Sequence, residues 1–114
     1  MEIPHESMLL RIFLGELHRW HSQPLYEAIV MRARDEHLAG ATVFRGPLGF
    51  GKSSRMHKTS LLRISEDIPV VVEIVDSEEK INAFLPILDE MLDSGLVTLE
   101  KVKTLSYRTR AAKS

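Results

Sequence analysis

Eight residues near the middle of the chain have the types and spacing of a nucleotide-binding loop. Residues 46–53 read Gly-Pro-Leu-Gly-Phe-Gly-Lys-Ser, which satisfies the P-loop pattern G-x-x-x-x-G-K-[ST] at every fixed position. In a P-loop the backbone N–H groups cradle the phosphates, the lysine reaches the outer phosphates, and the hydroxyl ligates Mg²⁺. On this interpretation Lys52 would carry charge to a phosphate and Ser53 would hold the metal.

The residues that follow the motif do not favour a P-loop. Such a loop runs straight into a helix whose amino end and dipole face the phosphates. This sequence continues Ser-Arg-Met-His-Lys-Thr and shows no amphipathic apolar face before Leu61. Two other interpretations remain open. The glycines can let the chain turn sharply away from a strand, or exposed amides together with Lys52 can form an anion site that is not an NTPase site.

Length and composition limit the class of protein. The chain has 114 residues, which suit one domain, 1–114, and hardly accommodate a complete P-loop enzyme. With 15 basic and 16 acidic residues the net charge is −1, so we expect no nucleic acid partner. The chain has no cysteine, and its first residues lack the basic patch and apolar run of a signal peptide. We therefore expect a protein of the reducing cytoplasm.

The first half of the chain has the pattern of a strand, a helix and a second strand. Residues 8–15 form an apolar run closed by glycine, which predicts a buried strand. Residues 22–38 carry an apolar stripe at helical spacing, with Ser22 as the expected N-cap. Residues 41–45 have a strand pattern and lead into the glycine-rich stretch, so residues 46–58 are predicted to be a loop.

The second half repeats this arrangement. Residues 59–64 resume a strand pattern, and the β-branched run 69–75 predicts a central strand. Residues 97–107 supply the last strand, and the basic tail 108–114 is expected to fray.

The second helix begins after residue 75. Asp76, with Glu79 three residues later, looks like a capping box. Apolar residues then recur at helical spacing over residues 81–92, although Pro86 should bend the helix or remove a hydrogen bond.

The resulting order of strand, helix, strand, loop, strand, helix and strand is the pattern of the ferredoxin-like split βαβ fold. We therefore predict an α+β sandwich with an antiparallel sheet and both helices on one face. Because strand 69–75 is apolar on both sides, the opposite face needs cover, and self-association is the simplest cover for a small domain.

Two stretches carry a resemblance to a known family. Residues 37–45, His-Leu-Ala-Gly-Ala-Thr-Val-Phe-Arg, followed by Gly-Phe-Gly-Lys at 49–52, resemble the start of the T-loop in the PII signal-transduction (GlnB-like) proteins. Residues 69–76 and the following helix resemble a later strand and helix of that family. The resemblance covers residues 8–107 and is closest to short prokaryotic PII-like proteins of unassigned function. In these, Pro-Leu-Tyr-Glu-Ala-Ile-Val, Gly-Phe-Gly and Glu-Ile-Val-Asp recur together.

The resemblance implies a homotrimer that is not an enzyme and whose subunit clefts hold a small anionic ligand, with ATP, ADP or AMP as candidates. Its loop would contact an unidentified protein partner, and a membrane transporter is one candidate. The candidate ligand-binding residues are Arg45, Gly49, Gly51, Lys52, Ser53, Arg108 and Arg110. The residues expected to touch the partner are Arg55, His57 and Lys58.

The chain departs from the PII pattern before its last strand. Where PII proteins have a second phosphate loop rich in glycine and lysine, residues 94–101 read Ser-Gly-Leu-Val-Thr-Leu-Glu-Lys. Two alternatives to a signalling protein remain open. One is a P-loop NTPase or kinase that uses residues 46–53, and the other is a structural or metal-tolerance trimer without a nucleotide role.

His18 and His21 could place two imidazoles near one metal, but no cysteine accompanies them. Neither a metal site nor a catalytic set is predicted.

Overall fold

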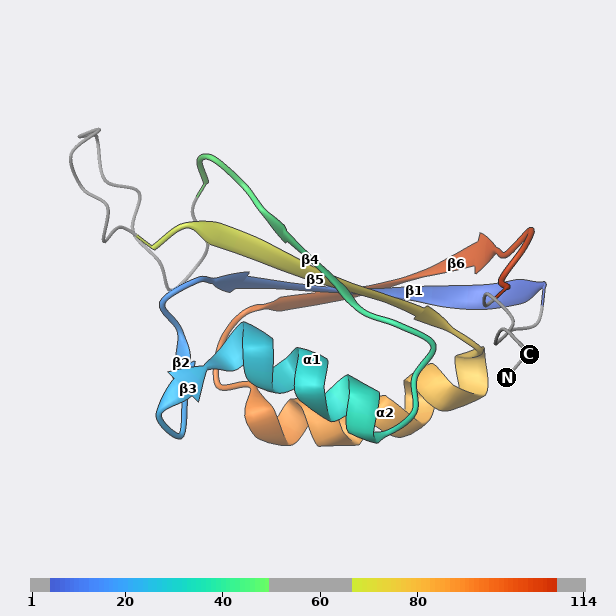
Figure 1. The fold of residues 1–114 in the computed structure, drawn as a ribbon, viewed down its shortest axis with the longest axis horizontal. Coiled ribbons are helices and arrows are strands. Elements are labelled where there is room, and N and C mark those ends of the chain that lie inside the picture. Colours follow the sequence, from blue (N-terminus) through green and yellow to red (C-terminus); the bar gives the residue numbers. More distant parts are fainter. Residues whose placement is uncertain (1–4, 50–66, 109–114) are drawn as a thin grey trace, which may run out of the picture.

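The computed structural model describes residues 5–49 and 67–108, in which a four-stranded sheet carries two helices on one face (Figure 1). The strands of this sheet are β1 (Glu6–Gly15), β4 (Thr42–Arg45), β5 (Pro69–Asp76) and β6 (Leu96–Lys103). They are ordered β4-β5-β1-β6, and every neighbouring pair is antiparallel. The helices are α1 (Leu25–Asp35) and α2 (Glu78–Met91), and a small hairpin of β2 (Arg19–Trp20) and β3 (Gln23–Pro24) precedes α1. This arrangement confirms the predicted α+β ferredoxin-like split βαβ fold.

The core lies between the sheet and the helices, because alternate residues of the central strands point toward α1 and α2. Leu10 and Ile12 of β1 are completely buried, and Ile74 and Val72 of β5 lie opposite them in register. The helices bury Leu25, Ala28, Ile29, Ala33, Ile81, Phe84, Leu88 and Met91 against this layer. The packing fixes the two central strands, from whose ends the connecting loops leave.

Helix α1 begins later than the sequence indicated. Ser22 is not its N-cap, because His21 and Ser22 both have positive φ angles, 51° and 69°, and form the two-residue turn between β2 and β3. A turn with two such residues matches the twist of a tight hairpin. The N-cap is Pro24, whose φ of −62° is already suited to the helix that follows.

Helix α2 is capped by Ser77 and not by Asp76. The Ser77 hydroxyl accepts a hydrogen bond from the Lys80 N–H at 3.1 Å. Asp76 instead accepts from the Ala39 N–H at 2.8 Å and from the Ser77 N–H at 2.6 Å. The expected N-cap was therefore misplaced by one residue, because the Asp76 side chain instead contacts Ala39, which is distant in sequence.

Replacing Ser77 by alanine is expected to lower the free energy of unfolding by about 1 kcal/mol, because the first turn of α2 loses its side-chain acceptor. Urea denaturation at equal protein concentration measures the change. Ser77→Asp keeps an acceptor and should unfold at nearly the wild-type urea concentration. A loss as large in Ser77→Asp as in Ser77→Ala would show that the cap does not stabilise the helix.

Other expectations have simpler outcomes. Pro86 lies at an exposed position inside α2 and does not end the helix, which runs on to Met91. Strand β6 ends at Lys103, earlier than expected. The predicted strand 59–64 lies outside the described residues. Within the described ranges, no helix is long and apolar enough to cross a membrane.

Candidate functional site

The chain that carries the glycine-rich motif leaves and rejoins the sheet at the same end, where β4 stops and β5 starts (Figure 1). We call residues 45–49 together with residues 67–69 the loop base. Three backbone donors tie the loop base together and to the end of β1. They are Gly46 N to Pro69 O, Glu16 N to Ile68 O, and Leu17 N to Asp67 Oδ1, each at 2.8 Å. Both ends of the intervening segment are thus fixed side by side by the sheet.

Arg45 is the positively charged side chain of the loop base, which also contains the carboxylate of Asp67. Its Nε donates to Glu16 Oε2 at 2.6 Å and its Nη2 to the Tyr26 hydroxyl at 2.9 Å, and the guanidinium lies 5.6 Å from the centre of the Tyr26 ring. The hydrogen bond and the charge of Glu16 raise the pKa of Arg45 above its ordinary value. The Arg45 side chain is nevertheless 53% exposed. A positioned and accessible guanidinium is suited to binding an anion beside the turn 46–49.

The glycines of this turn allow a close approach of two chain segments. A Cβ atom on Gly46 or on Gly49 would lie 3.2 Å from Cγ of Pro69, closer than most carbon contacts. Gly15, at the end of β1, is more constrained, because a Cβ there would lie 2.0 Å from Oδ2 of Asp67. Glycine at positions 46 and 49 therefore lets the turn 46–49 lie against Pro69, and glycine at position 15 lets Asp67 lie against the end of β1.

The sequence-predicted site residues divide into three groups. Arg45 and Gly49 are brought together in the loop base. Arg108 lies elsewhere, because Thr104 N donates to His5 O at 2.7 Å and the Tyr107 hydroxyl to Ala39 O at 3.0 Å, where β1 begins and β5 ends. The ten residues of β1, about 30 Å, separate that end from the loop base. Gly51, Lys52, Ser53, Arg55, His57, Lys58 and Arg110 lie outside the described residues.

The connection between α2 and β6 lies at the same end of the sheet as the loop base, on the opposite edge. Its Asp93 carboxylate lies 2.8 Å from Nε2 of His18, which precedes the β2–β3 hairpin. Gly95 has φ of +122°, and a Cβ on it would lie 3.0 Å from the carbonyl oxygen of Phe13. The contact between His18 and Asp93 thus links the segment before the β2–β3 hairpin to the connection between α2 and β6. Within residues 5–49 and 67–108, no three His, Cys, Asp or Glu side chains lie close enough together to hold a metal ion.

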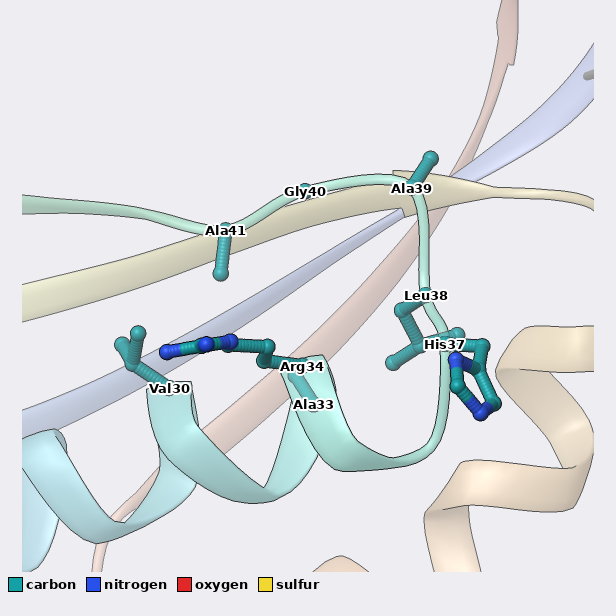
Figure 2. Close-up of a pocket in the computed structure, with 8 residues that line it drawn as sticks. All are labelled: Val30, Ala33, Arg34, His37, Leu38, Ala39, Gly40 and Ala41. Carbon is teal, nitrogen blue, oxygen red and sulfur yellow. The ribbon is translucent and has the colours of Figure 1, made fainter. Parts of the chain in front are cut away.

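A pocket that the sequence did not indicate lies at the carboxyl end of α1 (Figure 2). It has a volume of about 420 Å³ and lies between α1 and residues 38–41, which lead into β4. Its lining residues are Val30, Ala33, Arg34, His37, Leu38, Ala39, Gly40 and Ala41. Arg34 and His37 were missed because they look like ordinary polar residues of an amphipathic helix end. The signal available in the sequence was an arginine and a histidine three residues apart, just before the small residues Ala39, Gly40 and Ala41.

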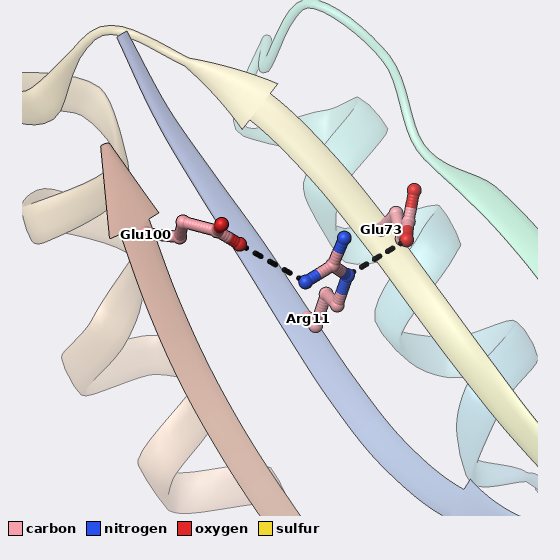
Figure 3. Close-up of polar contacts among 3 residues, drawn as sticks. All are labelled: Arg11, Glu73 and Glu100. Atoms are coloured by element: carbon pink, nitrogen blue, oxygen red, sulfur yellow. Dashed lines mark hydrogen bonds and ion pairs between the residues drawn. The ribbon is translucent and has the colours of Figure 1, made fainter. Parts of the chain in front are cut away.

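The sheet face without helices carries an apolar row and a charged cluster. Phe44, Val71, Phe13 and Leu96 are paired across the four strands in one row. Phe13, Phe44 and Leu96 are 36%, 52% and 57% exposed. Beside the row, Arg11 donates to Glu73 at 2.9 Å and to Glu100 at 3.0 Å (Figure 3). The hydrogen bond to Glu73 is the main cause that raises the pKa of Arg11.

The fold is that of PII-like proteins. A Thermus thermophilus protein described as PII-like and signalling aligns with a TM-score of 0.63 at 18% identity, covering 91% of this chain and 93% of that one. The CPII protein of Thiomonas intermedia K12, solved with ADP and bicarbonate, aligns with a TM-score of 0.56 at 16% identity, covering 87% and 88%. These likenesses concern the fold, and they confirm the resemblance stated from the sequence.

The chain belongs to the DUF190 family, described as "Uncharacterized ACR, COG1993", whose model matches residues 7–104. A UPF0166 protein of Aquifex aeolicus is 42% identical over 100 residues, which cover 88% of this chain and 94% of the relative. A UPF0166 protein of Methanocaldococcus jannaschii is 33% identical over 95 residues, covering 82% and 87%.

Proposed function

We propose that this chain is a signalling or regulatory protein that binds an adenine nucleotide at clefts between its subunits and acts on a protein partner through residues 46–58. The observation that carries the proposal is the loop base. Arg45 is held by Glu16 and Tyr26 beside a glycine turn, at the point where a long segment leaves the sheet. The solved CPII structures with ADP, and with ADP and AMP, have the same fold and support the choice of ligand class.

The nucleotide phosphates would lie against the turn 46–49 and its continuation. Glycines at 46, 49 and 51 permit close approach of the backbone, whose N–H groups can form an anion nest. Lys52 and Arg45 would neutralise the phosphate charge. A phosphate that binds Arg45 would break its hydrogen bond to Glu16 and so change the conformation in which the loop leaves the sheet. The partner would bind the two loop conformations with different affinity.

We propose that the protein is a homotrimer, because the helix-free face needs cover. The row Phe44, Val71, Phe13 and Leu96 exposes aromatic and aliphatic side chains on a sheet that has no helix on this side. Contact between copies would bury this row. It would also let Arg108 and Arg110 of one copy approach the loop base of another, which the length of β1 prevents for Arg108 within one chain.

The sheet gives little support to a P-loop NTPase or kinase. In P-loop enzymes the strand before the motif belongs to a parallel sheet with crossover helices. Here β4 is the edge strand of an antiparallel sheet and pairs only with β5 among the described strands. The structural or metal-tolerance trimer likewise gains no specific support, since no group of three or more metal-ligating side chains forms in the described part of the chain.

Calorimetric titration with ATP, ADP, AMP and cyclic nucleotides, with and without Mg²⁺, tests the proposal. We expect at least one adenine nucleotide to bind without turnover. Arg45→Gln and Lys52→Ala should each weaken binding about tenfold or more, because each removes a charge-assisted hydrogen bond to phosphate.

Arg32→Gln is the matched control, since it removes the same charge from an exposed arginine of α1 that pairs with Glu36 and not with the loop base. Its affinity should equal that of the wild type. Hydrolysis of ATP that disappears in Lys52→Ala would favour the enzyme, and no heat with any nucleotide would contradict the proposed function.

A further inference from the structure

We propose that the pocket at the carboxyl end of α1 binds a small organic carboxylate with a short aliphatic body. This site is separate from the proposed nucleotide site, because the pocket adjoins the start of β4 and the loop base lies at the end of β4. The two sites would therefore use different residues of the same chain.

Arg34 supplies the charge that such a ligand needs. Its guanidinium has no hydrogen bond or ion pair within residues 5–49 and 67–108, whereas Arg32, on the same helix, is paired with Glu36 at 3.0 Å. Figure 2 shows the Arg34 side chain lying along the cavity between Val30 and Ala41. The planar fork of a guanidinium matches the two oxygens of a carboxylate.

The rest of the lining favours an aliphatic body and does not repel an anion. Val30, Ala33, Leu38 and Ala41 present only aliphatic side chains, and His37 adds a second nitrogen-bearing group at one end. The lining includes no Asp or Glu. The volume of about 420 Å³ falls within the range of about 300–1,000 Å³ that is usual for small-molecule sites.

The carboxyl end of a helix carries partial negative charge, which opposes an anion. In α1 this effect is reduced because the last carbonyls are already occupied. Glu36 N donates to Arg32 O at 2.9 Å, Leu38 N to Ala33 O at 3.0 Å, and His37 N to Arg34 O at 3.0 Å. The full charge of Arg34 at the cavity exceeds the remaining half charge of the helix end.

The wall formed by residues 37–41 is fixed from three directions. Asp76 at the end of β5 accepts from Ala39 N, the Tyr107 hydroxyl donates to Ala39 O, and Lys80 of α2 donates through Nζ to His37 O. A wall that is already ordered loses little conformational entropy when a ligand binds. The pocket is thus a preformed site and not a gap between mobile segments.

Titration of the full chain with sodium pentanoate, followed by ¹⁵N chemical shifts, tests this proposal, with pentanamide as the neutral analogue. Pentanoate should shift the amide signals of residues 38–41, and pentanamide should bind at least tenfold more weakly. Arg34→Gln should reduce pentanoate affinity about tenfold or more, while Arg32→Gln should leave it unchanged. Ala41→Leu keeps the charge but fills the cavity, and should also abolish binding.

Several results would overturn the proposal. These are no shift with pentanoate, equal binding of pentanamide, an equal loss in Arg32→Gln and Arg34→Gln, or binding of inorganic phosphate in preference to pentanoate. Competition between pentanoate and a nucleotide would place both in one site and would also overturn it. Nucleotide binding that persists in Ala41→Leu leaves the proposed function intact, so the two proposals can fail separately.

Discussion

Replacing Asp76 by alanine is expected to lower the free energy of unfolding by about 3 kcal/mol, the largest loss that we expect from one polar side chain of this fold. The carboxylate is 1% exposed and accepts from the N–H groups of Ala39 and Ser77. Each hydrogen bond to a charged group contributes about 1.5–3 kcal/mol, and removing the acceptor leaves two donors without a partner in the interior. The loss also frees Ala39 from β5.

Urea denaturation at equal protein concentration measures this effect, because the stability of an oligomer depends on concentration. Asp76→Asn retains one acceptor oxygen and should fall between the wild type and Asp76→Ala. The matched control is Asp89→Ala on the exposed face of α2, which should change stability by less than about 0.5 kcal/mol. Equal unfolding of the Asp76 and Asp89 alanine variants would show that the Asp76 contacts contribute nothing.

Replacing Phe13 by glutamate is expected to dissociate the proposed trimer into single chains. Phe13 lies in the middle of the apolar row on the helix-free face, between Val71 and Leu96. Burying a carboxylate there without a partner would cost several kcal/mol per subunit. Because the residue is 36% exposed in the single chain, the variant should still fold.

Light scattering coupled to size exclusion measures the result as a fall from three chain masses to one, 13.0 kDa. Met31→Glu is the control, since it introduces the same charge at an exposed apolar residue of α1, on the other side of the molecule. A wild-type protein that is already a single chain would contradict the proposal, as would a trimer that survives in Phe13→Glu.

The fold could be predicted from the sequence because its main signals are local. Glycine at residue 15, the β-branched run 69–75 and the apolar stripes of the two helices each identify an element from neighbouring residues. One error arises from a contact with a residue distant in sequence, and the other from a short local hairpin. Asp76 looks like a helix cap until Ala39 is brought beside it, and Ser22 looks like a cap until the β2–β3 hairpin requires a turn there.

The candidate site could be predicted only in part. The glycines and Arg45 stand out in the sequence, but the partners of Arg45, Glu16 and Tyr26, come from two other parts of the chain. Arg108 shows the opposite difficulty, because a family pattern suggests a role that a single chain does not bring near the loop base. The cavity beside Arg34 depends on how residues 38–41 pass over α1, which no local pattern records.

The hydrogen bond between Gly46 and Pro69 bears on how long the segment between these two residues can be. Because the sheet already holds residues 46 and 69 together, the chain between them can grow or shrink without disturbing the core. Doubling the length of such a closed loop adds only about 0.6 kcal/mol of closure entropy. A foreign segment of different length grafted between these two positions should therefore leave the rest of the domain folded.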